Sequence, residues 1–133
     1  MNIPTLYHHL GILLLRVAFG ARLIYGTIDN IVSWDRMLEF SDFLEGHGFI
    51  FSTGCAVLSV YAQFLAGICW IIGFKVRWTS LIMIGNFLVA LLFVHIKNGD
   101  PYLALAPALH LLVVSVVLFL IGSGNYAVRA DRS

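Results

Sequence analysis

Four long apolar stretches, at about residues 10–28, 54–74, 76–96 and 102–122, take up most of this 133-residue chain. An α-helix rises about 1.5 Å per residue, so about 20 apolar residues cross the roughly 30 Å hydrocarbon core of a bilayer. Only 11% of the residues are charged, whereas a water-soluble domain carries about 25%. The sequence therefore predicts an all-α fold, an integral membrane four-helix bundle in which residues 1–133 form one membrane domain surrounded by the lipid bilayer.

Other protein classes fit the sequence poorly. The first apolar stretch is too long for a cleavable signal peptide, contains Arg16 and Arg22, and is followed by no small-residue cleavage site. A net charge of +1 argues against nucleic-acid binding. The chain has no P-loop, no dinucleotide-binding glycine pattern and no zinc-hydrolase motif.

The basic residues of the short connections predict the orientation in the membrane. Lys75 and Arg77 separate the second and third stretches, and Arg129 and Arg132 lie in the tail. The connection between the first two stretches has five acids and only Arg36 to balance them. Because cytoplasmic connections are enriched in Lys and Arg, we expect both termini on the cytoplasmic side of a cytoplasmic (inner) membrane.

Residues 34–45, in the long first connection, have the pattern of a short amphipathic helix on the outer membrane surface. Ser33 suits an N-cap, and Asp35 in the first turn suits the helix dipole. The pattern predicts an apolar face and an acidic face, made respectively of Trp34, Met37, Leu38 and Leu44, and of Asp35, Glu39 and Asp42. This helix either covers the ends of the bundle with a solvated acidic face or docks a partner protein.

Against this apolar background, each polar residue at membrane depth requires an internal partner or a ligand, because lipid supplies no hydrogen bonds. These residues are Arg16, Arg22, Tyr25, Gln63, Asn86, His95 and His110.

Three of them have candidate partners in the sequence. Arg16 and Arg22 lie about 9 Å inside the inner and outer faces, where a long side chain can also reach the interface. Arg22 shares a helix face with Asp29, which predicts an ion pair at the outer rim. Gln63 lies near the midplane, where Arg16 is a plausible hydrogen-bond partner and simple helix–helix adhesion is the alternative.

His95 and His110 flank the connection between the third and fourth stretches, an arrangement that invites a haem or metal interpretation. Their depths differ by roughly 10 Å, which is too much for both to bind one ion. We therefore predict no metal site. The histidines act either as hydrogen-bonding or proton-exchanging groups in an outer cavity or as polar contacts within the bundle. Cys55 and Cys69 lie about 21 Å apart along one helix and are expected to be unpaired packing residues.

The chain also resembles a known family. The relevant motifs are Leu14-Leu15-Arg16 and Tyr25-Gly26, a connection through Phe40 and Phe43 to Gly48, the run Tyr61 to Gly67, then Gly73, Arg77, His95 and Gly122-x-Gly124-x-Tyr126. In this order they resemble the DoxX family of small bacterial and archaeal membrane proteins.

The resemblance implies a four-helix bundle in the cytoplasmic membrane. The relatives that gave the family its name are subunits of a thiosulfate:quinone oxidoreductase, and other members are linked to membrane redox complexes. Many members have an acid where this chain has Gln63, so a carboxylate-based proton mechanism at that position is not carried over.

Two functions follow as hypotheses. In the first, the protein is a redox-linked subunit that binds a quinone or similar lipophilic carrier, with donors from Arg22, Tyr25, His95 and His110. No residue set here suits a flavin, haem or cluster, so we expect no intrinsic cofactor, and electrons would come from a membrane or peripheral redox partner. In the second, it is a non-enzymatic accessory or assembly protein that binds its partner through the acidic outer helix.

A third function, a small-solute channel or transporter, would require a homo-oligomer, because four short spans enclose little volume. A pocket open to lipid on which Arg22, Tyr25 and His95 converge would favour the quinone hypothesis. A packed core in which these groups satisfy one another would count against it.

Overall fold

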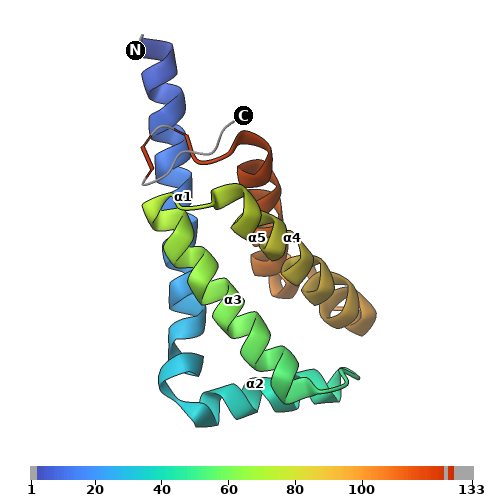
Figure 1. The fold of residues 1–133 in the computed structure, drawn as a ribbon. Helices are drawn as coiled ribbons and strands as arrows, with labels where there is room; N and C mark the ends of the chain where they lie inside the picture. Colours follow the sequence, from blue (N-terminus) through green and yellow to red (C-terminus); the bar gives the residue numbers. More distant parts are fainter. Residues whose placement is uncertain (1–2, 125, 128–133) are drawn as a thin grey trace.

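The computed structural model describes residues 3–124 and 126–127, and these fold into helices joined by short connections (Figure 1). The helices are α1 (Ile3–Val32), α2 (Trp34–Gly46), α3 (Ser52–Ile72), α4 (Val76–Val89), η1 (Ala90–Ile96) and α5 (Tyr102–Ile121). α1, α3, α4 with η1, and α5 are each long and apolar enough to cross a membrane. The all-α membrane bundle predicted from the sequence is therefore confirmed.

Two pairs of helices make up the bundle. α1 packs along α3, α4 packs along α5, and a buried core that includes Trp70, Met83 and Leu118 joins the two pairs. α1 begins and α5 ends at the same end of the bundle, which we call the terminal end (Figure 1). α2 lies across the other end, which we call the α2 end.

The contact between α1 and α3 depends on two glycines. A Cβ atom on Gly20 would lie 2.7 Å from the carbonyl oxygen of Gly67, and a Cβ on Gly67 would lie 2.7 Å from the carbonyl oxygen of Gly20. Without side chains at these positions the two backbones approach closely, as small residues permit in membrane helices. This crossing fixes which parts of α1 and α3 lie opposite each other.

α2 forms where the sequence predicts an amphipathic helix. The Ser33 hydroxyl caps it by accepting a hydrogen bond from the backbone N–H of Arg36 at 3.4 Å. Its buried residues are Met37, Ser41 and Leu44, and α2 packs against α3 and α1.

The predicted apolar face of α2 is only partly correct. Trp34 and Leu38 are exposed, whereas Ser41 is buried and hydrogen-bonds with the hydroxyls of Ser52 and Thr53 at 3.2 and 2.8 Å. The i, i+4, i+7 spacing of residues 37, 41 and 44 sets the contact face, and a hydroxyl partner across that contact makes burial of Ser41 favourable. The acids of α2 are exposed.

The third span changes its helix type near the α2 end. α4 is an α-helix as far as Val89, and the span then continues as the π-helix η1. π-helical turns are rare and frequently occur at functional sites. Here the π-helical segment supplies Ala90, Val94 and His95 to the wall of a cavity.

Candidate functional site

A cavity of about 620 Å³ lies between α3 and the α4–η1–α5 hairpin, with α1 and α2 completing its wall. We call it the chamber. Most of the side chains that line it are apolar, and Phe40, Phe43 and Phe49 contribute aromatic rings at the α2 end. Its polar lining residues are Arg22, Ser59, Gln63, Asn86 and His95.

A second hollow of about 440 Å³ adjoins the chamber at the α2 end. The two share Gly26, Phe40, Phe43 and Gln63 as lining residues. Charged and amide side chains, namely Asp29, Asn30, Arg36 and Glu39, stand in the wall of the second hollow. We call it the vestibule, and within it Arg36 pairs with Glu39 at 3.5 Å.

Arg22 lies on the α1 wall of the chamber, where Gly26 makes room for it. A Cβ atom on Gly26, one turn further along α1, would be only 2.7 Å from Nη1 of Arg22. The guanidinium therefore passes over Gly26, and the Arg22 side chain is exposed along this wall. Among residues 3–124 and 126–127 it forms no hydrogen bond or ion pair.

The predicted Arg22–Asp29 ion pair is thus wrong. Asp29 lines the vestibule and not the chamber. The Arg22 guanidinium lies over Gly26, which is about one helical turn before Asp29 on α1.

A chain of three polar side chains joins α3 to α4 on the opposite wall. Gln63 Nε2 donates to the hydroxyl oxygen of Ser59 at 3.0 Å, and the Ser59 hydroxyl donates to Asn86 Oδ1 at 2.6 Å. Ser59 has one hydroxyl hydrogen, so the chain has a direction. Among the described residues the amide oxygen of Gln63 and the amide N–H groups of Asn86 form no further hydrogen bond, and both residues line the chamber.

His95 lines the chamber near its α2 end and is held by the turn that follows η1. Its Nδ1–H donates to Asp100 Oδ2 at 2.8 Å, and the backbone N–H of Asp100 donates to the carbonyl of His95 at 2.9 Å. The hydrogen bond from His95, followed by one from Asn98, lowers the pKa of the Asp100 carboxyl below its ordinary value. The carboxylate fixes which ring nitrogen of His95 carries the proton.

Arg16 lies outside the chamber, toward the terminal end, and is 1% exposed. Its guanidinium donates to the carbonyl oxygens of Trp70 and Ile71, at 2.8 and 3.3 Å, in the last turn of α3. It also donates to the carbonyls of Ser123 and Tyr126, at 2.7 and 2.6 Å, beyond α5. The predicted contact with Gln63 is wrong, because carbonyls at the end of a helix lack donors and attract a cation.

Gly73 completes the Arg16 site. It ends α3 with φ +79°, a conformation that favours glycine, and a Cβ there would lie 2.7 Å from Nη2 of Arg16. Arg16 therefore joins the end of α3 to the chain beyond α5, which is a structural role.

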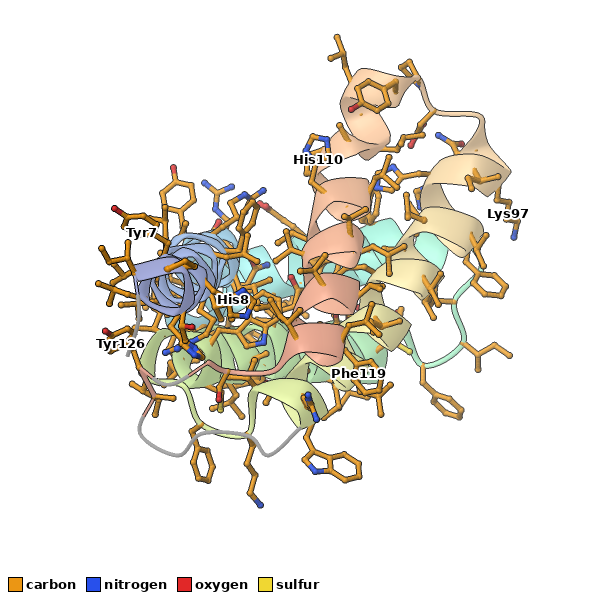
Figure 2. All side chains as sticks on the ribbon, turned by 90° about the horizontal axis from the view of Figure 1, so that it is seen from above. Tyr7, His8, Lys97, His110, Phe119 and Tyr126 are labelled. Carbon is orange, nitrogen blue, oxygen red and sulfur yellow. The ribbon has the colours of Figure 1, made fainter. Side chains whose placement is uncertain are left out.

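Two of the candidate residues point away from the chamber. Tyr25 is 80% exposed, because it stands two residues from both Leu23 and Thr27 and so falls on the opposite side of α1 from these buried positions. His110 is exposed and hydrogen-bonds with the Tyr102 hydroxyl at 3.1 Å. Figure 2 shows His110 and Lys97 on opposite sides of the α4–α5 hairpin.

The chamber therefore brings together Arg22, Gln63, Asn86 and His95, but neither Tyr25 nor His110. The α5 residues that do line it, Ala104, Pro107, Ala108 and Leu111, follow the i, i+3, i+4, i+7 spacing of one face, and His110 lies on another. Sequence reasoning did not select Ser59, although its i, i+4 spacing to Gln63 was a usable signal. Among the described residues no three His, Cys, Asp or Glu side chains cluster as metal ligands.

Comparison with known proteins identifies the family. The DoxX family model matches residues 11–96, from the first span to the end of η1. No curated protein and no solved structure matches the chain. The matched range includes Arg16, Gly26, Gln63 and His95, while the Gly122-x-Gly124-x-Tyr126 motif lies beyond it. Because the match covers more than half of the 133 residues, this integral membrane chain belongs to the DoxX family.

Proposed function

We propose that this protein is a redox-linked membrane subunit that holds a quinone, or a similar lipophilic carrier, in the chamber. The observation that carries the proposal is a cavity of about 620 Å³, largely apolar, with a few polar groups on facing walls. Ligand sites are typically concave, about 300–1,000 Å³ in volume and mostly apolar, with few polar groups that set orientation.

The lining suits a ring with carbonyl oxygens. Arg22 on α1 and the amides of Gln63 and Asn86 offer N–H donors, and the aromatic rings near the α2 end offer an apolar surface for the ring and its tail. His95 is placed to exchange a proton with a carrier, and its bond to Asp100 holds it in one tautomer. Electrons would reach the carrier from a partner protein.

The proposal includes an orientation. Lys75 lies in the connection between α3 and α4, and Arg77 lies in the first turn of α4, both at the terminal end; the exposed acids of α2 lie at the other end. By the positive-inside rule the terminal end faces the cytoplasm of the inner membrane. The chamber then lies in the outer half of the bilayer.

Binding of a labelled short-chain quinone to the protein in lipid nanodiscs, measured against empty nanodiscs, tests the proposal. We expect saturable binding that Ala62→Phe weakens about tenfold or more, because Ala62 lines the chamber and a phenyl ring there would fill it. Ala18→Phe, at an exposed position of α1, is the matched control and should bind as the natural chain does.

Two results would contradict the proposal. One is the absence of saturable binding by the natural chain. The other is an equal effect of Ala62→Phe and Ala18→Phe, once both variants are shown to be monodisperse and to have a cooperative thermal transition.

A further inference from the structure

We propose that Arg22 makes the chamber selective for an amphiphile whose head group is an anionic carboxylate or enolate. The inference rests on the proposed function in that the chamber must hold a membrane-soluble ligand. It goes further by naming the charge of that ligand and the residue that binds the charged group.

The first step is the depth of Arg22. Gly20 of α1 lies against Gly67 of α3, and Arg22 lies two residues further toward the α2 end. At about 1.5 Å per residue its backbone lies about 3 Å past this contact, within one helical turn of the level of Gln63 on α3. A guanidinium at this depth is costly unless it meets an acceptor, and ionisable residues inside a membrane mark functional sites.

The second step is that the protein does not itself supply that acceptor. Among the described residues Arg22 forms no hydrogen bond or ion pair. The acids in the wall of the adjoining vestibule are Asp29 and Glu39, and Glu39 pairs with Arg36. No Asp or Glu is among the described residues that line the chamber.

The third step is that the backbone leaves room for the guanidinium. Gly26 lines both the chamber and the vestibule, and any side chain there would collide with Nη1 of Arg22. The charge therefore lies where the apolar chamber meets the polar vestibule. A ligand with its tail in the chamber would place its head group at this junction.

The fourth step is that the facing wall adds donors. In the Gln63–Ser59–Asn86 chain the Asn86 amide N–H groups form no hydrogen bond with the described residues, and Asn86 lines the chamber. An anionic oxygen between Arg22 and this wall would accept charge-assisted hydrogen bonds, which are shorter and stronger than neutral ones. The attraction between unlike charges is also stronger beside a mostly apolar lining than in bulk water.

The test uses two probes that differ only in charge. An alkyl-substituted hydroxynaphthoquinone has an acidic enol and is anionic near neutral pH, whereas its O-methyl ether has the same ring and tail but is neutral. Binding of each is measured in nanodiscs of zwitterionic lipid and corrected for partition into empty nanodiscs. We expect the natural chain to bind the anion about tenfold more tightly or better, because hydrogen bonds to charged groups are the stronger ones.

Three variants assign the preference. Arg22→Gln should abolish it, and Lys97→Gln, which removes an exposed cation that lines neither the chamber nor the vestibule, should leave it unchanged. Gly26→Ala keeps the charge but displaces the guanidinium, so we expect the preference to fall several-fold. The added methyl meets only the flexible end of Arg22, and alanine is the better helix former, so the thermal stability of Gly26→Ala should be equal or higher.

The outcomes separate this inference from the proposed function. Equal binding of the two probes by the natural chain overturns the inference and leaves the quinone chamber standing. Saturable binding of neither probe overturns both. A preference for the anion that survives in Arg22→Gln also overturns the inference, because the charge is then read elsewhere.

Discussion

Two arginines six residues apart on α1 meet opposite environments. Arg16 is buried and donates to four backbone carbonyls, two at the end of α3 and two beyond α5. Arg22 faces the chamber and forms no hydrogen bond or ion pair with the described residues. Both lie within a membrane span, where charged side chains are rare.

The difference follows from where each arginine lies along α3. Arg16 is level with the last turn of α3, where the carbonyls have no intrahelical donors and a cation completes them. Arg22 is level with the interior of α3, where each carbonyl already accepts a bond from its own helix. A helix end can therefore satisfy a buried arginine with backbone alone, whereas mid-helix an arginine depends on side chains or a ligand.

The largest effect is expected from removing the buried cation. Arg16→Gln deprives four carbonyls of charged donors, so we expect a loss of about 3 kcal/mol or more in the free energy of unfolding. Arg22→Gln should change it by less than about 0.5 kcal/mol, because no protein partner is lost. Reversible unfolding of both variants in bicelles measures the difference, and equal destabilisation would remove the distinction between the two sites.

The second prediction concerns the α1–α3 contact that lies between the two arginines. Gly20 lies between Arg16 and Arg22, and a methyl there would meet the carbonyl oxygen of Gly67 across the α1–α3 contact. The Gly67 carbonyl is part of the α3 backbone and cannot rotate away from the methyl. Gly20→Ala should therefore lower the free energy of unfolding by about 1–3 kcal/mol.

Gly11→Ala is the control on the same helix. No atom lies within 4 Å of the added methyl, and the substitution should be neutral or slightly stabilising. If Gly20→Ala were as benign as Gly11→Ala, the register that sets the two arginines apart would have another origin.

Much of the fold was predictable because lipid restricts the choices. A chain with four long apolar stretches must form helices to satisfy its backbone, so the number of spans follows from the sequence. The Ser33 cap and the helix that follows it were also predictable, since capping is local. The switch from α4 to η1 was not, because nothing in the run from Val89 to Ile96 departs from an ordinary apolar helix.

The site was harder to predict, for two physical reasons. Helices that are apolar on all sides do not reveal their inward face, so the outward orientation of Tyr25 and His110 appears only in the packed bundle. The partners of Arg16 are backbone carbonyls, which every residue has, so the sequence does not single them out. Two of these carbonyls belong to Ser123 and Tyr126, which are more than 100 residues from Arg16 in the chain. Gln63 and His95 could be selected because polar side chains stand out at membrane depth.

A smaller effect is expected from the polar chain on the chamber wall. Ser59→Ala removes the link between Gln63 and Asn86. Interhelical hydrogen bonds in membrane proteins contribute about 0.6 kcal/mol on average and up to about 1.7, so we expect a loss of that order. Ser115→Ala is the control, because the Ser115 hydroxyl donates only to Leu111 of its own helix. Similar losses in both variants would show that the chain does not join α3 to α4.

The smallest expected effect is a difference between the two ends of the molecule in how acid changes their amide exchange. The hydrogen bond from His95 lowers the pKa of Asp100 in the folded protein, so this contact stabilises the fold above the ordinary carboxyl pKa of about 3.9 and is lost as pH falls through the lowered value. Acid should therefore speed amide exchange at residues 94–100 while the turn held by Arg16 at the terminal end stays protected, since a guanidinium does not titrate there. Asp100→Asn should remove this acid response, whereas Asp42→Asn, at an exposed acid of α2, should leave it intact. If acid sped amide exchange at the Arg16 end as much as at the His95 turn, the two ends would unfold as one unit. The difference between the two ends would then be one of contacts and not of local stability.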